Sequence, residues 1–194
     1  MRVIAGQYRG RTLLAPPGLR LRPTSDALRE TLFNILAAKV LGAVFVDACA
    51  GTGAVGIEAL SRGAAEAVFV EPSRAALDAL RANLSRLPAA PAEIIARPMP
   101  DALARLPRPA DLLFLDPPYS AAEVYEASLA ALGMERAPDV LQPEAWVIAE
   151  HARRRDLAEA YGRLHRFRVV TQGDSQLSFY AIAAAAFVNR AEKK

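Results

Sequence analysis

The residues best suited to chemistry in this chain are Asp116, Pro117, Pro118 and Tyr119, together called the clamp below. They follow the apolar run 112–115, which predicts a buried strand. Two consecutive prolines cannot continue a central strand, so the chain should leave the sheet stiffly at its carboxyl end. A carboxylate and a proline carbonyl would accept both N–H bonds of a planar amine, while the tyrosine ring stacks on it. The alternative is a simple turn in which the aspartate is a cap.

A glycine-rich loop is the second candidate site. Asp47 and Ala48 end a predicted strand, and Gly51, Thr52 and Gly53 follow it and precede a predicted helix. The two glycines would let the backbone approach a ligand, and the helix N-terminus adds oriented N–H groups. With Gly56 the stretch contains the G-x-G-x-x-G pattern of dinucleotide sites, and Glu71 ends the next predicted strand, where an acid binds ribose hydroxyls. The alternative is a helix start with glycines for tight packing.

Two cofactors share the adenosine that such a loop and Glu71 would hold, namely NAD and S-adenosylmethionine. Asp47 would repel a pyrophosphate but could face the cationic amino group of a methionine moiety. An amine-accepting clamp also has no evident use in a dehydrogenase. The two features together favour S-adenosylmethionine, with Ala48, Thr52 and Pro72 beside it.

The N-terminal residues carry an uneven charge. Residues 1–25 hold five arginines and no acidic residue, whereas the whole chain has a net charge of only +3. A cationic arm on a near-neutral body indicates a phosphate-rich partner, although a solvated basic tail is the alternative. The residues expected to contact the phosphates of this partner are Arg9, Arg11, Arg20 and Arg22, with Arg29 closer to the active site.

Composition excludes several classes of protein. Hydrophobic residues make up 53% of the chain, enough for a sizeable core, but no apolar run has the length of a membrane span. The arginine-rich start lacks a signal-peptide pattern, so a cytoplasmic protein without membrane contact is expected. A single cysteine, Cys49, permits no internal disulfide, and the two histidines form no cluster with it, so no metal site is expected.

Hydrophobic periodicity predicts alternating strands and helices. Such alternation indicates an α/β fold, a mainly parallel sheet of seven strands with helices on both faces and an antiparallel C-terminal hairpin. An N-terminal β-hairpin arm should cover residues 1–23, the main domain 24–188 and a frayed tail 189–194. The expected strands are 43–48, 67–71, 93–96, 111–116, 145–150, 164–170 and 177–184, and the expected helices are 24–39, 54–62, 73–87, 101–106, 121–133 and 152–161.

Over nearly its whole length the chain resembles the RsmD-type methyltransferases, which have a Rossmann-like class I fold. The resemblance rests on four stretches: the opening 2–11, the first-helix signature Arg22–Asn34, the loop and helix Asp47–Ala64, and the clamp. The first-helix signature is the most specific, because the loop and the clamp also occur in other amino-methyltransferases.

The resemblance implies methyl transfer from S-adenosylmethionine to the N2 amine of a guanine in small-subunit (16S) ribosomal RNA, free or in an assembling subunit, by a monomer. This sequence departs from the family after the third strand, where Met99 stands between two prolines and would meet the adenine through its backbone N–H or its side chain. Two alternatives stay open: an amino-methyltransferase acting on adenine N6 or another amine, and an NAD-dependent oxidoreductase.

Overall fold

The structure is a computed structural model that describes residues 1–15, 25–88, 90–118, 121–135 and 140–182. Tyr119, Arg20, Arg22 and the predicted tail 189–194 lie outside these ranges. The strands are β1 (Val44–Ala48), β2 (Glu66–Val70), β3 (Ala92–Ile95), β4 (Ala110–Leu115), β5 (Leu141–Ala152), β6 (Ala160–Tyr161), β7 (Leu164–Gln172) and β8 (Ser175–Ile182). The helices are α1 (Asp26–Leu36), α2 (Ala54–Ser61), α3 (Arg74–Leu84) and α4 (Ala122–Gly133), with 3₁₀ turns η1 (Ala37–Val40) and η2 (Asp101–Arg105).

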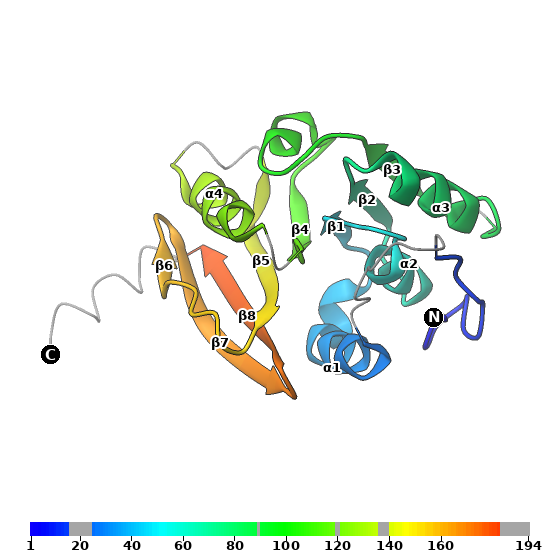
Figure 1. Ribbon diagram of the computed structural model, residues 1–194, viewed down its shortest axis with the longest axis horizontal. Coiled ribbons are helices and arrows are strands. Elements are labelled where there is room, and N and C mark those ends of the chain that lie inside the picture. The colour runs from blue at the N-terminus through cyan, green and yellow to red at the C-terminus, as the bar shows by residue number, and fades with distance from the viewer. Residues whose placement is uncertain (16–24, 89, 119–120, 136–139, 183–194) are drawn as a thin grey trace, which may run out of the picture.

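All of the strands belong to one sheet in the order β3-β2-β1-β4-β5-β8-β7-β6. The first five are parallel, and β8, β7 and β6 continue the sheet with antiparallel pairing. Figure 1 shows β3 and α3 at one end of the sheet and the β6–β8 strands at the other. The predicted α/β fold with a C-terminal hairpin is confirmed, although the described sheet has eight strands rather than seven.

Apolar side chains alternate along the central strands and so build a core on each face. Val46 and Ala48 of β1 pack with α4 and η2 on one face, whereas Phe45 packs with α1 and α2 on the other. A third cluster joins α2 and α3 to the N-terminal arm. Because both faces are covered, the parallel strands contain consecutive apolar residues rather than a polar–apolar alternation.

The arm is docked against the domain along the part that the structure describes. Val3, Tyr8 and Leu13 are buried against α2 and α3. The predicted hairpin reduces to one antiparallel bridge between Arg2 and Thr12, with a hydrogen bond from Val3 N to the Arg11 carbonyl. The amides of Ile4, Ala5, Tyr8 and Leu14 bond instead to side chains of the helices beneath the arm.

The helix predicted over 152–161 is wrong. β5 continues to Ala152, a turn follows, and β6 pairs with β7 through the two-residue turn Gly162–Arg163. Leu157, Tyr161 and Leu164 are buried at spacings that imitate one helix face. Three consecutive arginines would oppose the positive end of a helix dipole, and Gly162 takes a φ of 56° that suits a hairpin turn.

Candidate active site

The glycine loop and the clamp meet at one edge of the sheet. Ala48 at the end of β1 pairs with Val70 of β2 and with Leu115 of β4, so the residues that follow these strands stand level with one another. The strand order reverses between β1 and β4, which is the switch point where open α/β sheets bind ligands. The geometry therefore brings together the loop that begins at Cys49, the acid Glu71 and the clamp that begins at Asp116.

The three glycine amides of the loop are already hydrogen-bonded inside the protein. Gly51 N donates to Glu71 Oε2 at 2.8 Å, Gly53 N to the Ala50 carbonyl at 2.8 Å and Gly56 N to Asp47 Oδ2 at 2.8 Å. A pyrophosphate needs such amides for itself. The loop is consequently built around two carboxylates, which suits a cationic ligand better than a dinucleotide.

Glu71 is a fixed acceptor at the carboxyl end of β2. Its Oε2 receives the Gly51 amide, and its Oε1 receives the Ser73 amide at 2.8 Å. Only 8% of the residue is exposed. The side chain is thus held beside the loop, at the position where the sequence places a ribose-binding acid, with Pro72 exposed next to it.

Asp47 lies under the start of α2, on the sheet face that carries Phe45. Its carboxylate accepts the Gly56 amide and so replaces the side-chain N-cap that Gly53 cannot supply. Burial raises the pKa of Asp47 to about 7, with the Glu71 carboxylate adding to the rise and the Gly56 N–H opposing it. A cation nearby would favour the ionised form, so Asp47 fits a ligand that brings positive charge.

Cys49 is surrounded by the acids of the site. Burial raises the pKa of its thiol well above the usual range, and the carboxylates of Asp116, Glu71 and Asp47 raise it further. A thiol held protonated in this way is a poor nucleophile.

The clamp leaves β4 in the predicted manner. Asp116 N donates to the Ala48 carbonyl at 3.3 Å, which ties the clamp to β1. Pro117 is buried and Pro118 is exposed, and the Pro118 carbonyl receives Ala121 N at 2.8 Å as the chain turns toward α4. The Asp116 carboxylate and the Pro117 carbonyl therefore stand at the end of β4, where the sequence predicts the two acceptors of an amine.

Tyr125 is a neighbour of the clamp that the sequence did not reveal. It is wholly buried on α4, and its hydroxyl lies 2.6 Å from the Glu150 carbonyl and 3.4 Å from the Pro117 carbonyl. The guanidinium of Arg155 lies 5.1 Å from the centre of its ring. Apolar spacing along α4 predicts a buried aromatic here, but no sequence signal connects it to Pro117.

The other predicted cofactor contacts have different surroundings. Thr52 is buried and its carbonyl accepts Asn83 Nδ2 at 3.0 Å, so this part of the loop is fixed to α3. Met99 is buried among apolar residues that include Val70, which precedes Glu71, and Ile95, the last residue of β3. Its side chain therefore borders the site from within the core, while Arg97 is exposed.

Arg9 and Arg11 lie exposed on the arm, and Arg11 Nη1 donates to the Arg86 carbonyl at 2.8 Å. Arg29 corrects an expectation. It is 0% exposed, and its Nη2 donates to the Arg2 carbonyl at 2.8 Å and to Asp26 Oδ1 at 2.7 Å. A guanidinium without exposed surface does not offer itself to an RNA phosphate, so Arg29 holds the arm to α1 instead.

Two findings concern only the described part of the chain. No group of three or more histidine, cysteine, aspartate or glutamate side chains is arranged to hold a metal ion there. None of its helices is both long enough and apolar enough to cross a membrane.

Comparisons with known proteins agree with the geometry of the site. The profile of one family, described as Conserved hypothetical protein 95, matches residues 1–181. A relative from Escherichia coli strain K12, Ribosomal RNA small subunit methyltransferase D, is 44% identical over 119 residues, which are 61% of this chain and only 60% of the relative. Putative rRNA methyltransferase YlbH from Bacillus subtilis strain 168 is 34% identical over 184 residues, covering 93% of this chain and 98% of that protein.

Among solved structures, Putative methyltransferase yhhF from Escherichia coli superposes with a TM-score of 0.79 at 35% identity, covering 95% of this chain and 98% of that one. The shared architecture is the class I methyltransferase fold, as the sequence predicted. Because the family profile extends over almost the whole chain, this protein belongs to the family described as Conserved hypothetical protein 95, that of the RsmD-type methyltransferases.

Proposed function

We propose that this protein transfers a methyl group from S-adenosylmethionine to the exocyclic N2 amine of a guanine in small-subunit (16S) ribosomal RNA. The observation that carries the proposal is the placement of the Asp116–Pro118 acceptors level with the glycine loop at the end of β1. The names of the Escherichia coli and Bacillus subtilis relatives, both rRNA methyltransferases, supply the substrate class.

The residues present fit S-adenosylmethionine, because the site combines acidic groups with loop amides that are already satisfied. Glu71 would hold the ribose hydroxyls and Asp47 would stabilise the positive charge, with Ala48, Gly51, Thr52 and Gly53 forming the wall and Pro72 and Met99 the adenine side. When bound, the cofactor supplies an electrophilic methyl group on a sulfonium.

The clamp's own part is to orient the amine. The nitrogen of an exocyclic amine is a weak nucleophile because its lone pair delocalises into the ring. Asp116 and the Pro117 carbonyl would accept its two N–H bonds, which favours a pyramidal nitrogen and directs the lone pair at the methyl group. Asp116 or solvent then takes the leaving proton, and Tyr119 would stack on the extruded base.

The RNA would be held through the arm. Arg9 and Arg11 are exposed there, and Arg20 and Arg22 continue the same basic segment. Such phosphate contacts position RNA without reading its sequence. We expect a cytoplasmic monomer, and both free ribosomal RNA and the assembling subunit are candidate substrates.

The test of the reaction is to map labelled methyl groups after treating total RNA and ribosomal particles from a strain that lacks the gene. The proposal predicts one labelled guanine N2 in small-subunit RNA. Label on adenine N6 would instead support the alternative amino-methyltransferase, whose chemistry the clamp would serve equally well. Label in no RNA would contradict the proposal.

The clamp is tested by Asp116→Ala. This variant should bind S-adenosylmethionine as the unchanged protein does, yet lose turnover by a factor of about 100 or more, because positioned acceptors act on the transition state. Isothermal titration and single-turnover methylation measure the two quantities. Methylation at the unchanged rate would exclude the clamp mechanism, and stabilisation by NAD but not by S-adenosylmethionine in a thermal-shift assay would favour the oxidoreductase.

A further inference from the structure

The turn Arg153–Arg155 at the end of β5, called the β5 turn here, is a basic surface at the active-site edge that the proposed function does not use. β5 runs parallel to β4, and Leu115 pairs with Ala149. Asp116 and Glu150 are therefore level, and the β5 turn begins three residues farther along the same edge. The correction of the predicted helix places these arginines here, because they extend the sheet edge rather than open a helix.

The β5 turn is held in a fixed position. Arg153 N donates to the Asp174 carbonyl at 2.8 Å, which joins it to the β7–β8 hairpin, and Arg155 N donates to the Ala152 carbonyl at 2.8 Å. Arg155 also covers the ring of Tyr125, whose hydroxyl reaches the Pro117 carbonyl at 3.4 Å. One line of contacts thus runs from the β5 turn to the clamp.

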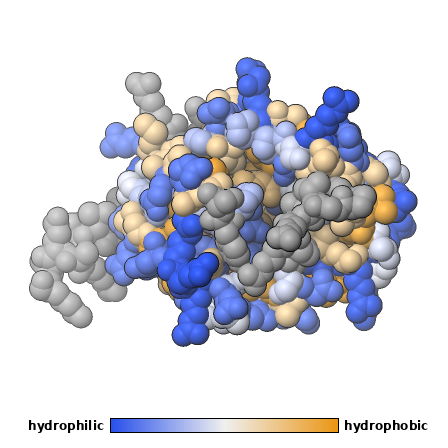
Figure 2. Space-filling model, viewed as in Figure 1, coloured by the Kyte–Doolittle hydropathy of each residue, from blue (hydrophilic) through white to orange (hydrophobic). Residues whose placement is uncertain are grey.

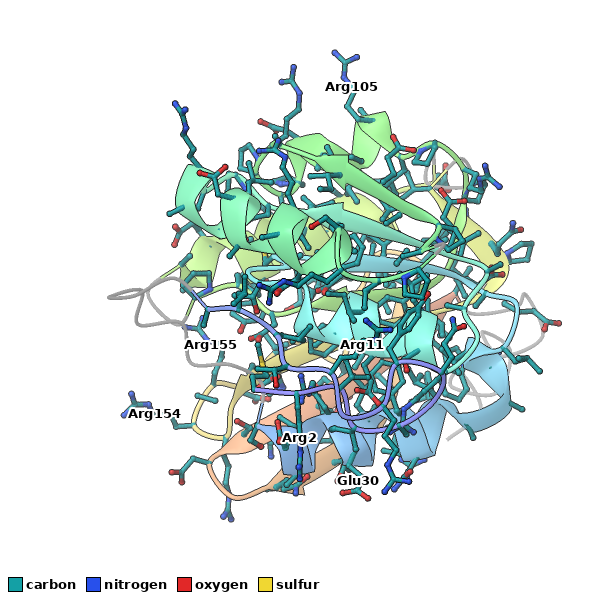
Figure 3. The ribbon with its side chains drawn as sticks, turned by 90° about the vertical axis from the view of Figure 1, so that its right-hand side faces the viewer. Arg2, Arg11, Glu30, Arg105, Arg154 and Arg155 are labelled. Carbon is teal, nitrogen blue, oxygen red and sulfur yellow. The ribbon has the colours of Figure 1, made fainter. Side chains whose placement is uncertain are left out.

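The charge of the β5 turn is turned outward. Arg153 and Arg154 are exposed, and Figure 3 shows the Arg154 side chain extending away from the ribbon while Arg155 lies close to it. Among the described residues no salt bridge involves Arg153 or Arg154, and the next acid along the chain, Asp156, pairs with Arg166 at 3.8 Å. Figure 2 shows hydrophilic side chains over much of this face of the molecule.

The arm and the β5 turn lie on opposite sides of the clamp in the sheet order. The arm packs on α2 and α3, over the β1–β2 side, whereas the β5 turn follows β5 on the other side of β4. We propose that Arg153 and Arg154 bind phosphates of the substrate RNA, so that the RNA is held on both sides of the amine that the clamp receives. This inference rests on the proposed function for the identity of the RNA.

The test is the salt dependence of binding to small-subunit ribosomal RNA, measured without cofactor. The slope of log affinity against log salt falls by roughly 0.7 to 0.9 for each phosphate contact that is lost. We expect that loss for Arg154→Ala and about twice that loss for the Arg153→Ala, Arg154→Ala double variant.

Arg105→Ala is the matched control. Arg105 is exposed on η2 and points away from the β5 turn in Figure 3, so its removal should leave the slope unchanged. A slope that stays the same in the double variant, or that falls equally for Arg105→Ala, overturns the inference. Failure of the proposed function shows separately, as absence of methyl transfer by the unchanged protein while the binding slopes remain measurable.

Discussion

At the scale of single residues, the site depends on carboxylates that are buried, where an ionised group loses the solvation it has in water. Asp47 accepts the Gly56 amide at the start of α2 and is only 2% exposed. Burial raises the pKa of Asp47 to about 7. The ionised carboxylate is therefore poorly solvated and would be stabilised by a cation bound beside it. A methyl donor with positive charge would supply that cation, so the residue contributes more to binding than to the stability of the free protein.

Asp47→Asn should stabilise the free protein in a pH-dependent manner. The pKa of Asp47 is higher in the folded than in the unfolded chain, so its contribution to stability is complete below about pH 4 and is lost as the pH rises through about 7. The advantage of the asparagine variant should therefore be larger at pH 8 than at pH 5 by about 2–3 kcal/mol. Urea unfolding at the two pH values measures it.

A surface carboxylate gives the control for this prediction. Asp78 on α3 has a side chain that is 66% exposed, so Asp78→Asn should change stability little at either pH. An asparagine variant at position 47 whose advantage does not grow with pH would contradict the assignment of a raised pKa.

At the scale of elements, buried polar side chains fix the arm on the helices. Glu58 of α2 is wholly buried and accepts Ile4 N at 2.7 Å, Ala5 N at 3.0 Å and Arg62 Nε at 2.7 Å. Asn83 of α3 binds the backbone of Leu14, since its Oδ1 accepts the Leu14 amide at 2.7 Å and its Nδ2 donates to the Leu14 carbonyl at 3.1 Å. The arm is therefore part of the folded domain over the residues described.

Glu58→Gln should loosen the arm. The amide keeps the size of the side chain, but its single oxygen can accept only one of the Ile4 and Ala5 amides while its NH2 group faces the other. It also presents no charge to Arg62. We expect a loss of about 2–4 kcal/mol in the free energy of unfolding and faster hydrogen exchange at the amides of Ile4 and Ala5. Glu66→Gln, which removes only a pair with the 60% exposed Arg108, should show neither effect.

The elements also show how far the sequence leads. Apolar runs and glycine signals predict β1, β2 and β4 and the loops after them, because these strands are buried on both faces and end in distinctive motifs. The helix error at 152–161 arose because Leu157 and Tyr161 have helical spacing whichever structure buries them. The role of Glu58 was missed and that of Arg29 was misassigned. Both side chains are buried because the fold brings a backbone partner to each, Ala5 to Glu58 and Arg2 to Arg29, and the sequence does not show these contacts.

At the scale of the whole molecule, the sheet has two halves with different tasks. The parallel strands β3 to β5 present the loop, Glu71 and the clamp at one edge, and the antiparallel strands extend that edge through the β5 turn. Tyr125 lies at the junction: its α4 packs on the parallel half, and its hydroxyl joins the clamp to the last residues of β5. The buried side chain of Tyr125 thus contacts both the clamp and the end of β5, where the two halves of the sheet meet.

Tyr125→Phe tests whether that junction matters for chemistry. Its hydroxyl donates to the Glu150 carbonyl at 2.6 Å and, over a longer distance of 3.4 Å, to the Pro117 carbonyl. The hydroxyl thus fixes the Pro117 carbonyl, which keeps a second lone pair for a substrate. Without the hydroxyl, the Pro117 carbonyl should lose its fixed place, and kcat should fall about tenfold with KM and cofactor affinity unchanged. Tyr180→Phe is the matched control, because it removes an equally buried hydroxyl that donates to the Ala158 carbonyl at 2.9 Å. Each variant should lose about 1 kcal/mol of stability. Equal activity of the two variants would assign Tyr125 a purely structural role. A loss of kcat confined to Tyr125→Phe would make Tyr125 a positioning residue for the clamp.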